Sequence, residues 1–315
     1  MAEQIHVVAG VLYDADGRVL LAQRLPGKHM AGRWEFPGGK LQSCESPSAG
    51  LARELLEELG VTVKQSTALI RVRHAYPERE VLLDVWRVAD YAGQPVGAEG
   101  QALRWIHVSE LHDADLLEAD KPIVDALNLP DRYAITPTPG DDLAAFSSQI
   151  ARVTAAGDCL LQLRAPRVDS RRLHELAVAA VQVARGCSVL INGDPRVTIP
   201  IALATGARGI HLPYRYVGQI SRQAIPAGFL VGASCHNLAE LEAASDSGAN
   251  FAVLGPVLPT PSHPGATTLG WDDYAALVDR ANLPVYALGG VELADIELAR
   301  TLGSQGVAGI RAFFG

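Results

Sequence analysis

Hydrophobic and polar positions divide the chain into two parts that predict different elements. In the first part, four stretches have the alternation typical of β-strands: residues 5–13, 19–23, 68–74 and 80–88. Turn-forming residues at 14–17 and 76–79 connect these strands in pairs, and for the first pair we predict a β-hairpin. Another strand is expected around Trp105, followed by a turn and then a helix within residues 109–127.

The same part contains a predicted helix with an acidic face. Pro47 fits its first turn, alanines and leucines fill its body, and Gly60 stands where a left-handed cap ends it. Glu54, Glu57 and Glu58 follow one another at spacings of three and four, which places their carboxylates on one surface. These like charges repel each other near a helix end that is itself negative. One interpretation is a solvated face; the other is a site for a hard divalent cation, by default Mg²⁺.

Beyond about Leu129 the pattern changes to short apolar strands that alternate with helical stretches. Prolines and the run Gly140-Asp141-Asp142 mark the connection, so we predict one domain at residues 1–128 and another at 129–315. The predicted strands are residues 133–136, 159–163, 188–192, 209–212, 229–233, 251–254, 285–289 and 306–310. Eight strands with intervening helices predict an α/β fold of the (β/α)₈ barrel type, with its site at the C-terminal strand ends.

Composition limits the classes of partner. The chain has 315 residues, 48% of them hydrophobic, and a net charge of −8, which gives no basic surface for a nucleic acid polymer. Its four cysteines lack metal-binding spacing, so we interpret them as free thiols in a reducing compartment. Neither a signal sequence nor a run of about eighteen apolar residues is present. We therefore expect a cytoplasmic protein without a membrane partner; its oligomeric state stays open.

The spacing of residues 39–61 resembles the Nudix box. Gly39 is followed after five residues by Glu45, and after seven more by Arg53-Glu54, an aliphatic residue, a spacer, Glu57-Glu58, a spacer and Gly60-Val61. The resemblance implies an α/β/α Nudix sandwich that hydrolyses a nucleoside diphosphate linked to another group. It also implies that Glu54, Glu57, Glu58 and the carbonyl of Gly39 bind the metal.

Residues before the box resemble those of MutT-type Nudix enzymes. Arg24 follows the second predicted strand, and residues 28–39, KHMAGRWEFPGG, lead into the box. The resemblance implies that Arg24 contacts phosphate and that this segment lines a nucleotide pocket. Phe36 is then a base-packing residue, with simple core packing as the alternative, and His29 is either a ligand or a solvated loop residue. Glu99, in a glycine-rich loop, joins the metal cluster or acts on the attacking water.

Asp120 departs from the MutT-type pattern, in which this position is typically Asn. The amide can donate to O6 and accept from N7–H of 8-oxoguanine, whereas a carboxylate only accepts. An ionised Asp120 therefore accepts N7–H but faces O6 unfavourably, and a protonated Asp120 mimics the amide. The preferred base is less well defined than the hydrolase chemistry.

The resemblance implies a Mg²⁺-dependent nucleoside triphosphate pyrophosphohydrolase, with Mn²⁺ able to substitute. The expected reaction converts 8-oxo-dGTP and water to 8-oxo-dGMP and pyrophosphate, which sanitises the nucleotide pool for DNA replication and repair. Glu54 or Glu99 takes the proton, and the sequence does not choose between them. We expect Arg53 to fix the orientation of a glutamate, for which Glu45 is a candidate, rather than to touch substrate.

The second part resembles the thiamin phosphate synthase and TenI family. The matching segments, in family order, are Gln162-Leu163-Arg164, Ile191-Asn192, Gly209-Ile210-His211-Leu212, Gly232-Ala233-Ser234-Cys235-His236, Gly255-Pro256-Val257, Pro259-Thr260-Pro261-Ser262 and Gly289-Gly290-Val291. Gly289 and Gly290 suit a phosphorylated ligand held by backbone N–H groups. The synthase lysines are replaced by Pro166 and His263, and its metal-binding acids are missing from their usual positions, so we expect no synthase activity.

Other functions for the barrel stay open. A TenI-like thiazole tautomerase needs only proton transfer, for which His236 is a candidate acid and base, although a merely hydrogen-bonded His236 is the alternative. The fusion could also pair hydrolysis of thiamin-related pyrophosphates with a barrel that binds an intermediate. A third hypothesis makes the barrel a non-catalytic ligand-binding or dimerisation module.

Overall fold

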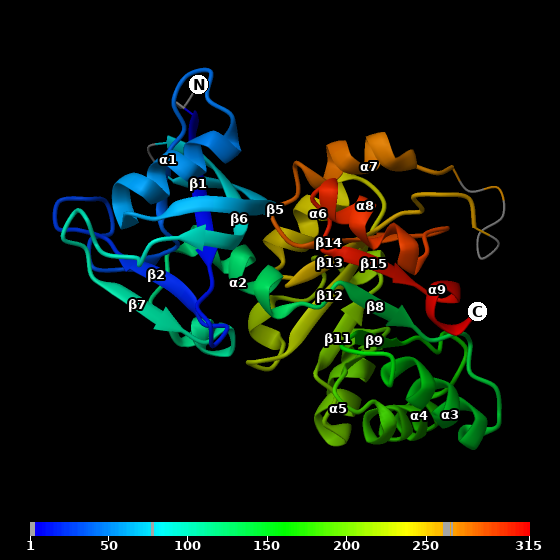
Figure 1. Ribbon diagram of the computed structural model, residues 1–315. Helices are drawn as coiled ribbons and strands as arrows, with labels where there is room; N and C mark the ends of the chain where they lie inside the picture. The colour runs from blue at the N-terminus through cyan, green and yellow to red at the C-terminus, as the bar shows by residue number, and fades with distance from the viewer. Residues whose placement is uncertain (1–3, 77–78, 261–264, 266) are drawn as a thin grey trace. The chain divides into compact units, whose positions relative to one another are not determined.

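The computed structural model describes residues 4–76, 79–260, 265 and 267–315 (Figure 1). The chain forms two compact units, Met1–Asn128 and Leu129–Gly315. Both predicted fold types, an α/β/α sandwich and a closed barrel of eight parallel strands, are confirmed. Among the described helices, none has the length and apolar character needed to cross a membrane.

The N-terminal unit is built on two sheets. The first has the strand order β4-β1-β6-β5 and the second has the order β3-β2-β7. The strands are β1 (Gln4–Leu12), β2 (Val19–Gln23), β3 (Trp34–Glu35), β4 (Gly38–Lys40), β5 (Thr62–Tyr76), β6 (Arg79–Ala92) and β7 (Leu103–Ile106). The helices are α1 (Pro47–Leu59), α2 (Lys121–Asn128) and the 3₁₀ segments η1 (Val108–Asp113) and η2 (Glu118–Asp120). The turn predicted at residues 76–79 includes 77 and 78, which lie outside the described residues.

The predicted N-terminal hairpin is wrong, although both of its strands exist. β1 lies in the middle of the first sheet, where it pairs with β4 on one edge and β6 on the other. Because both edges of β1 are occupied, β2 pairs in the second sheet with β3 and β7 instead. A single bridge between Tyr13 and Val19 is what connects the two strands at the turn.

Alternation along β1 places helices on both faces of the first sheet. Val8 and Leu12 belong to a buried cluster with Leu51 and Leu55 of α1. The intervening residues Ala9 and Val11 belong to a second cluster, which contains apolar residues of α2. Gly10 lies between the two α1-facing residues, and a Cβ added there would be 2.9 Å from Leu55 Cδ1. Glycine at this position therefore lets α1 approach the sheet closely.

The C-terminal unit is the barrel, with neighbouring strands in the order β8 to β15 and closure between β15 and β8. Its strands are β8 (Arg132–Ile135), β9 (Leu160–Leu163), β10 (Ser188–Asn192), β11 (Gly209–Leu212), β12 (Leu230–Cys235), β13 (Phe251–Leu254), β14 (Val285–Leu288) and β15 (Gly306–Gly309). All eight were predicted to within two residues at each end. This accuracy follows from the apolar, short and well-separated character of barrel strands.

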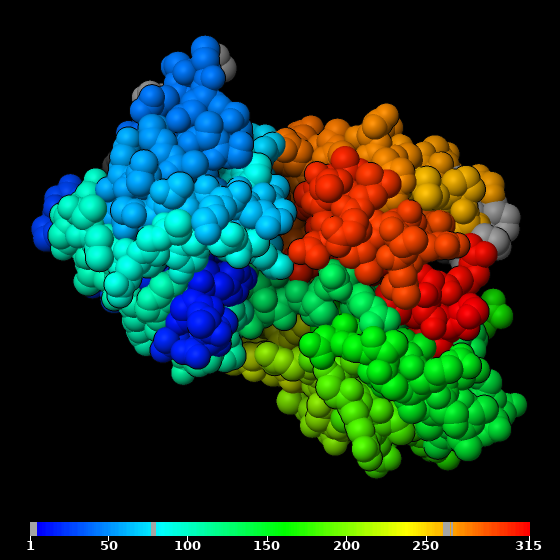
Figure 2. Space-filling model, in the orientation of Figure 1, coloured from blue at the N-terminus to red at the C-terminus, as the bar shows by residue number. Residues whose placement is uncertain are grey.

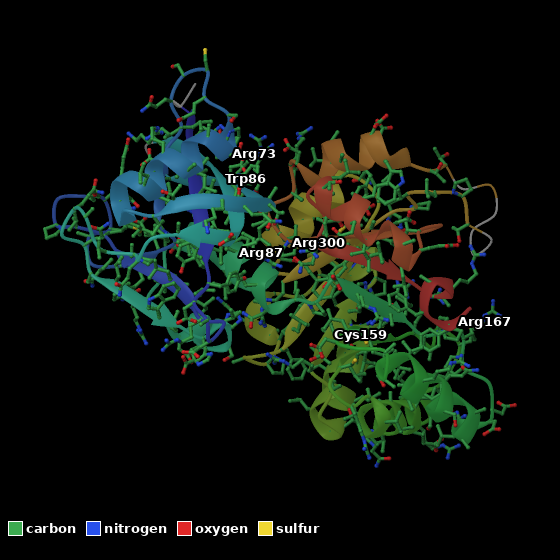
Figure 3. All side chains as sticks on the ribbon, in the orientation of Figure 1. Arg73, Trp86, Arg87, Cys159, Arg167 and Arg300 are labelled. Atoms are coloured by element: carbon green, nitrogen blue, oxygen red, sulfur yellow. The ribbon has the colours of Figure 1, made fainter. Side chains whose placement is uncertain are left out.

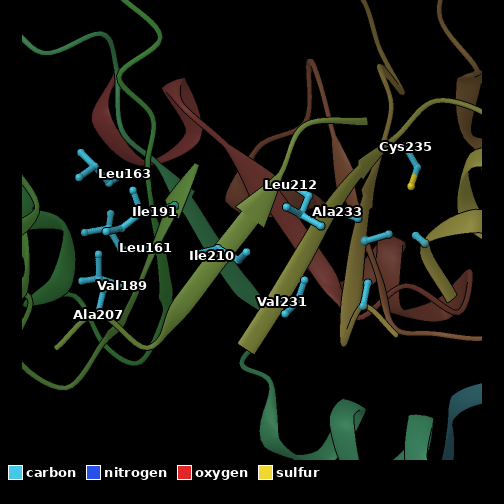
Figure 4. Packing of buried hydrophobic residues seen from close by; sticks show 14 of the residues in the cluster. Leu161, Leu163, Val189, Ile191, Ala207, Ile210, Leu212, Val231, Ala233 and Cys235 are labelled. Atoms are coloured by element: carbon cyan, nitrogen blue, oxygen red, sulfur yellow. The ribbon is translucent and has the colours of Figure 1, made fainter. Parts of the chain in front are cut away.

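Helices cover the outside of the barrel. They are α3 (Leu143–Thr154), α4 (Ser170–Val183), α5 (Pro195–Thr205), α6 (Leu238–Asp246), α7 (Gly270–Val278), α8 (Ile296–Thr301) and α9 (Arg311–Phe314), with 3₁₀ segments η3 (Tyr214–Tyr216), η4 (Arg222–Ala224) and η5 (Leu293–Asp295). Alternate strand residues, such as Leu161, Ile191 and Val231, form the large cluster under these helices (Figure 4). The other residues, including Tyr133, Phe251 and Tyr286, fill the barrel interior.

Candidate functional site

Helix α1 carries the acidic face of the N-terminal unit. The Ser46 side chain caps its start by accepting from Ala49 N at 3.3 Å, and Gly60 ends it with φ 69°, as predicted. Buried leucines hold one side of α1 against the sheet, whereas the opposite side lies at the surface of this unit (Figure 2). The three glutamates therefore project from a helix whose position is set by packing.

Arg53 connects the carboxylates of the box. Its Nε and Nη2 donate to the two carboxylate oxygens of Glu45, each at 2.9 Å. Its Nη1 donates to Glu54 at 2.7 Å and to Glu57 at 3.2 Å, and Nη2 also donates to the carbonyl oxygen of Lys40 at 3.1 Å. The hydrogen bonds with Glu45 raise the pKa of Arg53, and those from Arg53 lower the pKa of Glu45. The predicted pairing of Arg53 with Glu45 is present.

Glu54 and Glu58 lie against the backbone of strand β4. Glu58 Oε2 accepts a hydrogen bond from Gly38 N at 3.0 Å. A Cβ added to Gly39 would be 2.2 Å from Glu54 Oε2, so this glycine leaves the space that the carboxylate uses. Burial raises the pKa of Glu58 to about 7, and the charges of Glu99 and Glu35 act in the same direction. The carboxylate beside Gly38 thus lies in the field of two other acidic side chains.

Glu99 lies on a loop that is attached to the end of α1. Ala98 N and the side-chain amide of Gln101 both donate to the carbonyl oxygen of Glu58, at 3.0 and 2.9 Å. Gln101 also accepts from Glu99 N at 2.9 Å, which fixes the backbone of the predicted site residue. The Glu99 carboxylate pairs with Lys28 Nζ at 3.2 Å. Unsatisfied carbonyl groups at the helix end thus position the loop.

Arg24 contacts both Glu35 and the loop residue His29. Arg24 Nη1 forms an ion pair with Glu35, and Arg24 Nε donates to the carbonyl oxygen of His29 at 2.6 Å. Burial raises the pKa of Glu35, and the charge of Arg24 opposes that shift. The exposed ring of His29 packs edge-on against Tyr76, with ring centroids 5.4 Å apart. Arg24 therefore connects the Glu35 carboxylate with the loop that carries His29.

Asp120 is buried, with 3% of its surface exposed, at the start of α2. The backbone N–H of Phe36 donates to its carboxyl group, and Oδ2 has no hydrogen-bond partner among the described residues. Burial raises the pKa of Asp120 well above its usual value, and the charge of Glu35 adds to the shift. Burial therefore favours the protonated form of this carboxyl group. Phe36 is also buried, at 4% exposure, within the core cluster that contains α2.

The donor chemistry around α1 fits a hard divalent cation, because carboxylate and carbonyl oxygens are the ligands that such ions prefer. Over the ranges that the structure describes, however, no three His, Cys, Asp or Glu side chains converge as a formed metal site. Glu54 and Glu57 form ion pairs with Arg53, and Glu99 forms an ion pair with Lys28. Side-chain rotation would be needed to bring these oxygens onto one ion.

The predicted barrel residues lie at the C-terminal ends of parallel strands, and so at one end of the barrel. Arg164 follows β9, Asn192 ends β10, His236 follows β12, and Gly289 and Gly290 follow β14. The two glycines have φ angles of 93° and 71°, which side-chain-bearing residues rarely adopt. His236 Nδ1 contacts Glu240 Oε2 at 2.8 Å, and the histidine ring packs edge-on against Tyr214. Two motif residues, Pro261 and Ser262, and His263 lie outside the described residues.

Gln162 instead belongs to a buried hydrogen-bonded chain inside the barrel. Its amide donates to Tyr133 Oη at 3.0 Å, Tyr133 Oη lies 3.0 Å from His211 Nδ1, and His211 Nε2 lies 2.9 Å from Ser234 Oγ. Tyr133 Oη thus accepts a hydrogen bond from Gln162 and shares another with His211 Nδ1. The His211 ring thereby connects the Tyr133 hydroxyl with the Ser234 hydroxyl. Burial lowers the pKa of His211 to about 3, which keeps the ring neutral.

Sequence reasoning missed several of these residues. Glu35 and Lys28 stand within the segment that leads into the box, and their charge was the available signal. Gln101 gave no signal, because its role is to bond with the backbone of a helix that ends 42 residues earlier. Tyr133 is identified by its hydrogen bonds with Gln162 and His211, and Glu240 is identified by its contact with His236.

An acidic helix on an α/β/α sandwich and a separate (β/α)₈ barrel define a hydrolase domain joined to a barrel domain. Residues 8–126 match the NUDIX domain family, and residues 132–313 match the thiamine monophosphate synthase family. The chain thus belongs to both families, the first through its N-terminal unit and the second through its C-terminal unit, and the N-terminal unit is a Nudix hydrolase.

Individual relatives match each unit separately. An 8-oxo-dGTP diphosphatase of Escherichia coli (strain K12) is 30% identical over 122 residues, which cover 39% of this chain and 95% of that protein. A CTP pyrophosphohydrolase of the same organism is 37% identical and covers 39% of this chain and 91% of its own length. A putative thiamine-phosphate synthase 2 of Aquifex aeolicus (strain VF5) is 32% identical and covers 59% of this chain and 99% of its own length.

Proposed function

We propose that the N-terminal domain is a Mg²⁺-dependent nucleoside triphosphate pyrophosphohydrolase, with 8-oxo-dGTP as its preferred substrate. The observation that carries the proposal is the carboxylate array of α1, ordered by Arg53 and set against Gly38 and Gly39. The products are 8-oxo-dGMP and pyrophosphate. Similarity to 8-oxo-dGTP diphosphatases supports the substrate class.

The chain's own residues have distinct roles in this proposal. Glu54, Glu57, Glu58, Glu99 and the Gly39 carbonyl would hold Mg²⁺, which supplies charge neutralisation for the triphosphate and its leaving group. Arg53 orients the helix glutamates, and Glu45 orients Arg53 in turn. Glu54 or Glu99 accepts the proton of the attacking water. Arg24 places positive charge beside the phosphates.

We further propose that Asp120 and Phe36 recognise the base. A protonated Asp120 offers a donor and an acceptor on one group, which matches O6 and N7–H of 8-oxoguanine. Its Oδ2 is buried and lacks a partner among the described residues, which supports an unmet hydrogen-bonding role. Ordinary guanine has no N7–H and leaves the acceptor unpaired, which costs binding energy.

For the barrel, we propose binding of a small phosphorylated ligand without synthase activity. Gly289 and Gly290 adopt left-handed conformations that suit a backbone phosphate site, and Pro166 replaces a cationic residue that the synthase reaction needs. A specific observation favours tautomerase chemistry as the second candidate: the contact with Glu240 orients the His236 ring at the strand ends.

Two measurements test the hydrolase proposal. Glu58→Gln should abolish Mg²⁺-dependent turnover while circular dichroism and thermal unfolding stay close to those of the parent. A matched control, Glu110→Gln on η1, should retain full activity. Retained turnover in Glu58→Gln would reject the site. A panel of 8-oxo-dGTP, dGTP, CTP and thiamin pyrophosphate should give the highest kcat/KM with 8-oxo-dGTP; a preference for thiamin pyrophosphate would reject the proposed substrate class.

A further inference from the structure

Two cysteines that are distant in sequence meet in the barrel. Cys159 directly precedes β9 and Cys187 directly precedes β10. Their Sγ atoms are 2.8 Å apart, although 28 positions separate the residues in sequence (Figure 3 labels Cys159). Both are present as free thiols.

The strand register explains why the two side chains meet. β9 and β10 are parallel neighbours, and their ladder pairs Leu160 with Ser188. Cys159 and Cys187 are therefore opposite each other one residue before the ladder begins. Neighbouring strands lie about 4.8 Å apart, which falls inside the roughly 4.4–6.8 Å range of Cα separations that a disulfide spans. Covalent linkage needs rotation of the thiols and no movement of the strands.

We propose that Cys159 and Cys187 form a dithiol site that reacts with low-molecular-weight disulfides and becomes an intrachain disulfide. Cys187 is half-buried and reachable, whereas Cys159 has 3% exposure. Cys187 is therefore the attacking thiol and Cys159 the resolving thiol. The inference is independent of the hydrolase proposal, since both residues belong to the barrel.

The exchange balances in two steps. The Cys187 thiolate attacks one sulfur of an external disulfide, forms a mixed disulfide and expels one thiolate. The Cys159 thiolate then attacks Cys187 Sγ, forms the protein disulfide and expels the second thiolate. The two protons from the cysteines pass through solvent to the expelled thiolates. Two protein thiols are oxidised and one external disulfide is reduced.

The other two cysteines are internal controls. Cys44 is exposed on the N-terminal unit, and Cys235 is buried with its thiol directed to the carbonyl oxygen of Glu240 at 3.3 Å. Neither is opposite another cysteine in the strand ladder.

Mass spectrometry of the full-length protein tests the proposal. After equilibration with excess oxidised glutathione, denaturation and alkylation with iodoacetamide, Cys44 should remain outside the protein cross-link. Cys159 and Cys187 should appear in one linked peptide pair that dithiothreitol releases. Cys159→Ser should leave a lasting glutathione adduct on Cys187, and Cys44→Ser should not change the cross-link. Full alkylation of Cys159 and Cys187 in the parent protein, or a cross-link that involves Cys44 instead, would overturn the proposal.

Discussion

Arg53 and Glu45 form a two-pronged ion pair, in which Nε donates to Oε1 and Nη2 donates to Oε2, both at 2.9 Å. The remaining donor, Nη1, reaches Glu54 and Glu57. One guanidinium thus sets the positions of three carboxylates. A planar fork is suited to this task, whereas an ammonium group is a single point of charge.

Arg53→Lys should therefore lower kcat strongly. Lysine cannot reproduce the fork, and loss of charge-assisted hydrogen bonds of about 1.5–3 kcal/mol corresponds to a decrease of about ten- to a hundredfold. Steady-state kinetics with 8-oxo-dGTP measures the effect. Arg171→Lys, at an exposed pair with Glu175 in the barrel, is the matched control and should be neutral. Equal kcat in Arg53→Lys and the parent protein would contradict the positioning role.

Asp120→Asn should change how pH affects substrate binding. Burial raises the pKa of Asp120, so the fraction of protonated carboxyl falls as pH rises through that raised value. The KM of the parent protein for 8-oxo-dGTP should therefore increase on the alkaline side, and that of Asp120→Asn should stay low. Profiles of KM against pH provide the test, and parallel profiles for the two proteins would remove Asp120 from base recognition.

Asp120→Asn should also change how the free energy of unfolding depends on pH. The folded-state pKa of Asp120 lies above its unfolded value, so the folded state binds more protons between the two values. The free energy of unfolding of the parent protein should decrease as pH rises through this window, and Asp120→Asn should lose that contribution. Urea denaturation at pH 4 and pH 7.5 measures the difference. The variant should gain relative stability at the higher pH.

Lys28→Met should strengthen metal binding in the absence of nucleotide. Lys28 pairs with Glu99, and its charge also acts on Glu58 and Glu35, so it competes with a cation for these carboxylates. Because the pair is about half exposed, we expect a gain of about two- to fivefold. Electron paramagnetic resonance of free Mn²⁺ measures the affinity. Lys64→Met, at the exposed pair with Asp90, is the control, and an unchanged or weaker affinity in Lys28→Met would refute the competition.

The barrel should lose stability in acid through His211. Its folded-state pKa is about 3, whereas an unfolded histidine titrates near roughly 6.5. Between these values the unfolded chain binds more protons, so the free energy of unfolding decreases as pH falls, by at most about 1.4 kcal/mol per unit. His211→Gln should give a flatter dependence than the parent, and the exposed His236→Gln should not. Denaturation of the barrel at pH 5 and pH 7.5 compares them; equal slopes would contradict the role of His211.

Local sequence signals predicted much of the fold. The Pro47 start and Gly60 cap of α1, its acidic face and the eight barrel strands depend on residues that are close in sequence, and each is present where expected. The hairpin between β1 and β2 failed because strand pairing depends on which edges other strands occupy. β6 takes one edge of β1, and it lies about seventy residues away in sequence.

The candidate site was predicted only where its contacts join residues that are close in sequence. The contact of Arg53 with Glu45 lies within one motif and could be anticipated. Gln162 was expected in a ligand site, but its partner Tyr133 is on another strand and draws the amide into the barrel interior. The pairing of Lys28 with Glu99 spans 71 positions, and sequence spacing gives no information about such contacts.

Gly10 connects core packing with the chemistry of the acidic face. Leu55 Cδ1 would be 2.9 Å from a Cβ at this position, and Leu55 directly follows Glu54 in α1. One added methyl group would also crowd Cδ1 of Leu12 and of Leu51, so these leucines would have to repack beneath the helix that carries the glutamates. The leucine packing behind the acidic face thus depends on a hydrogen atom in place of a carbon at one position of β1.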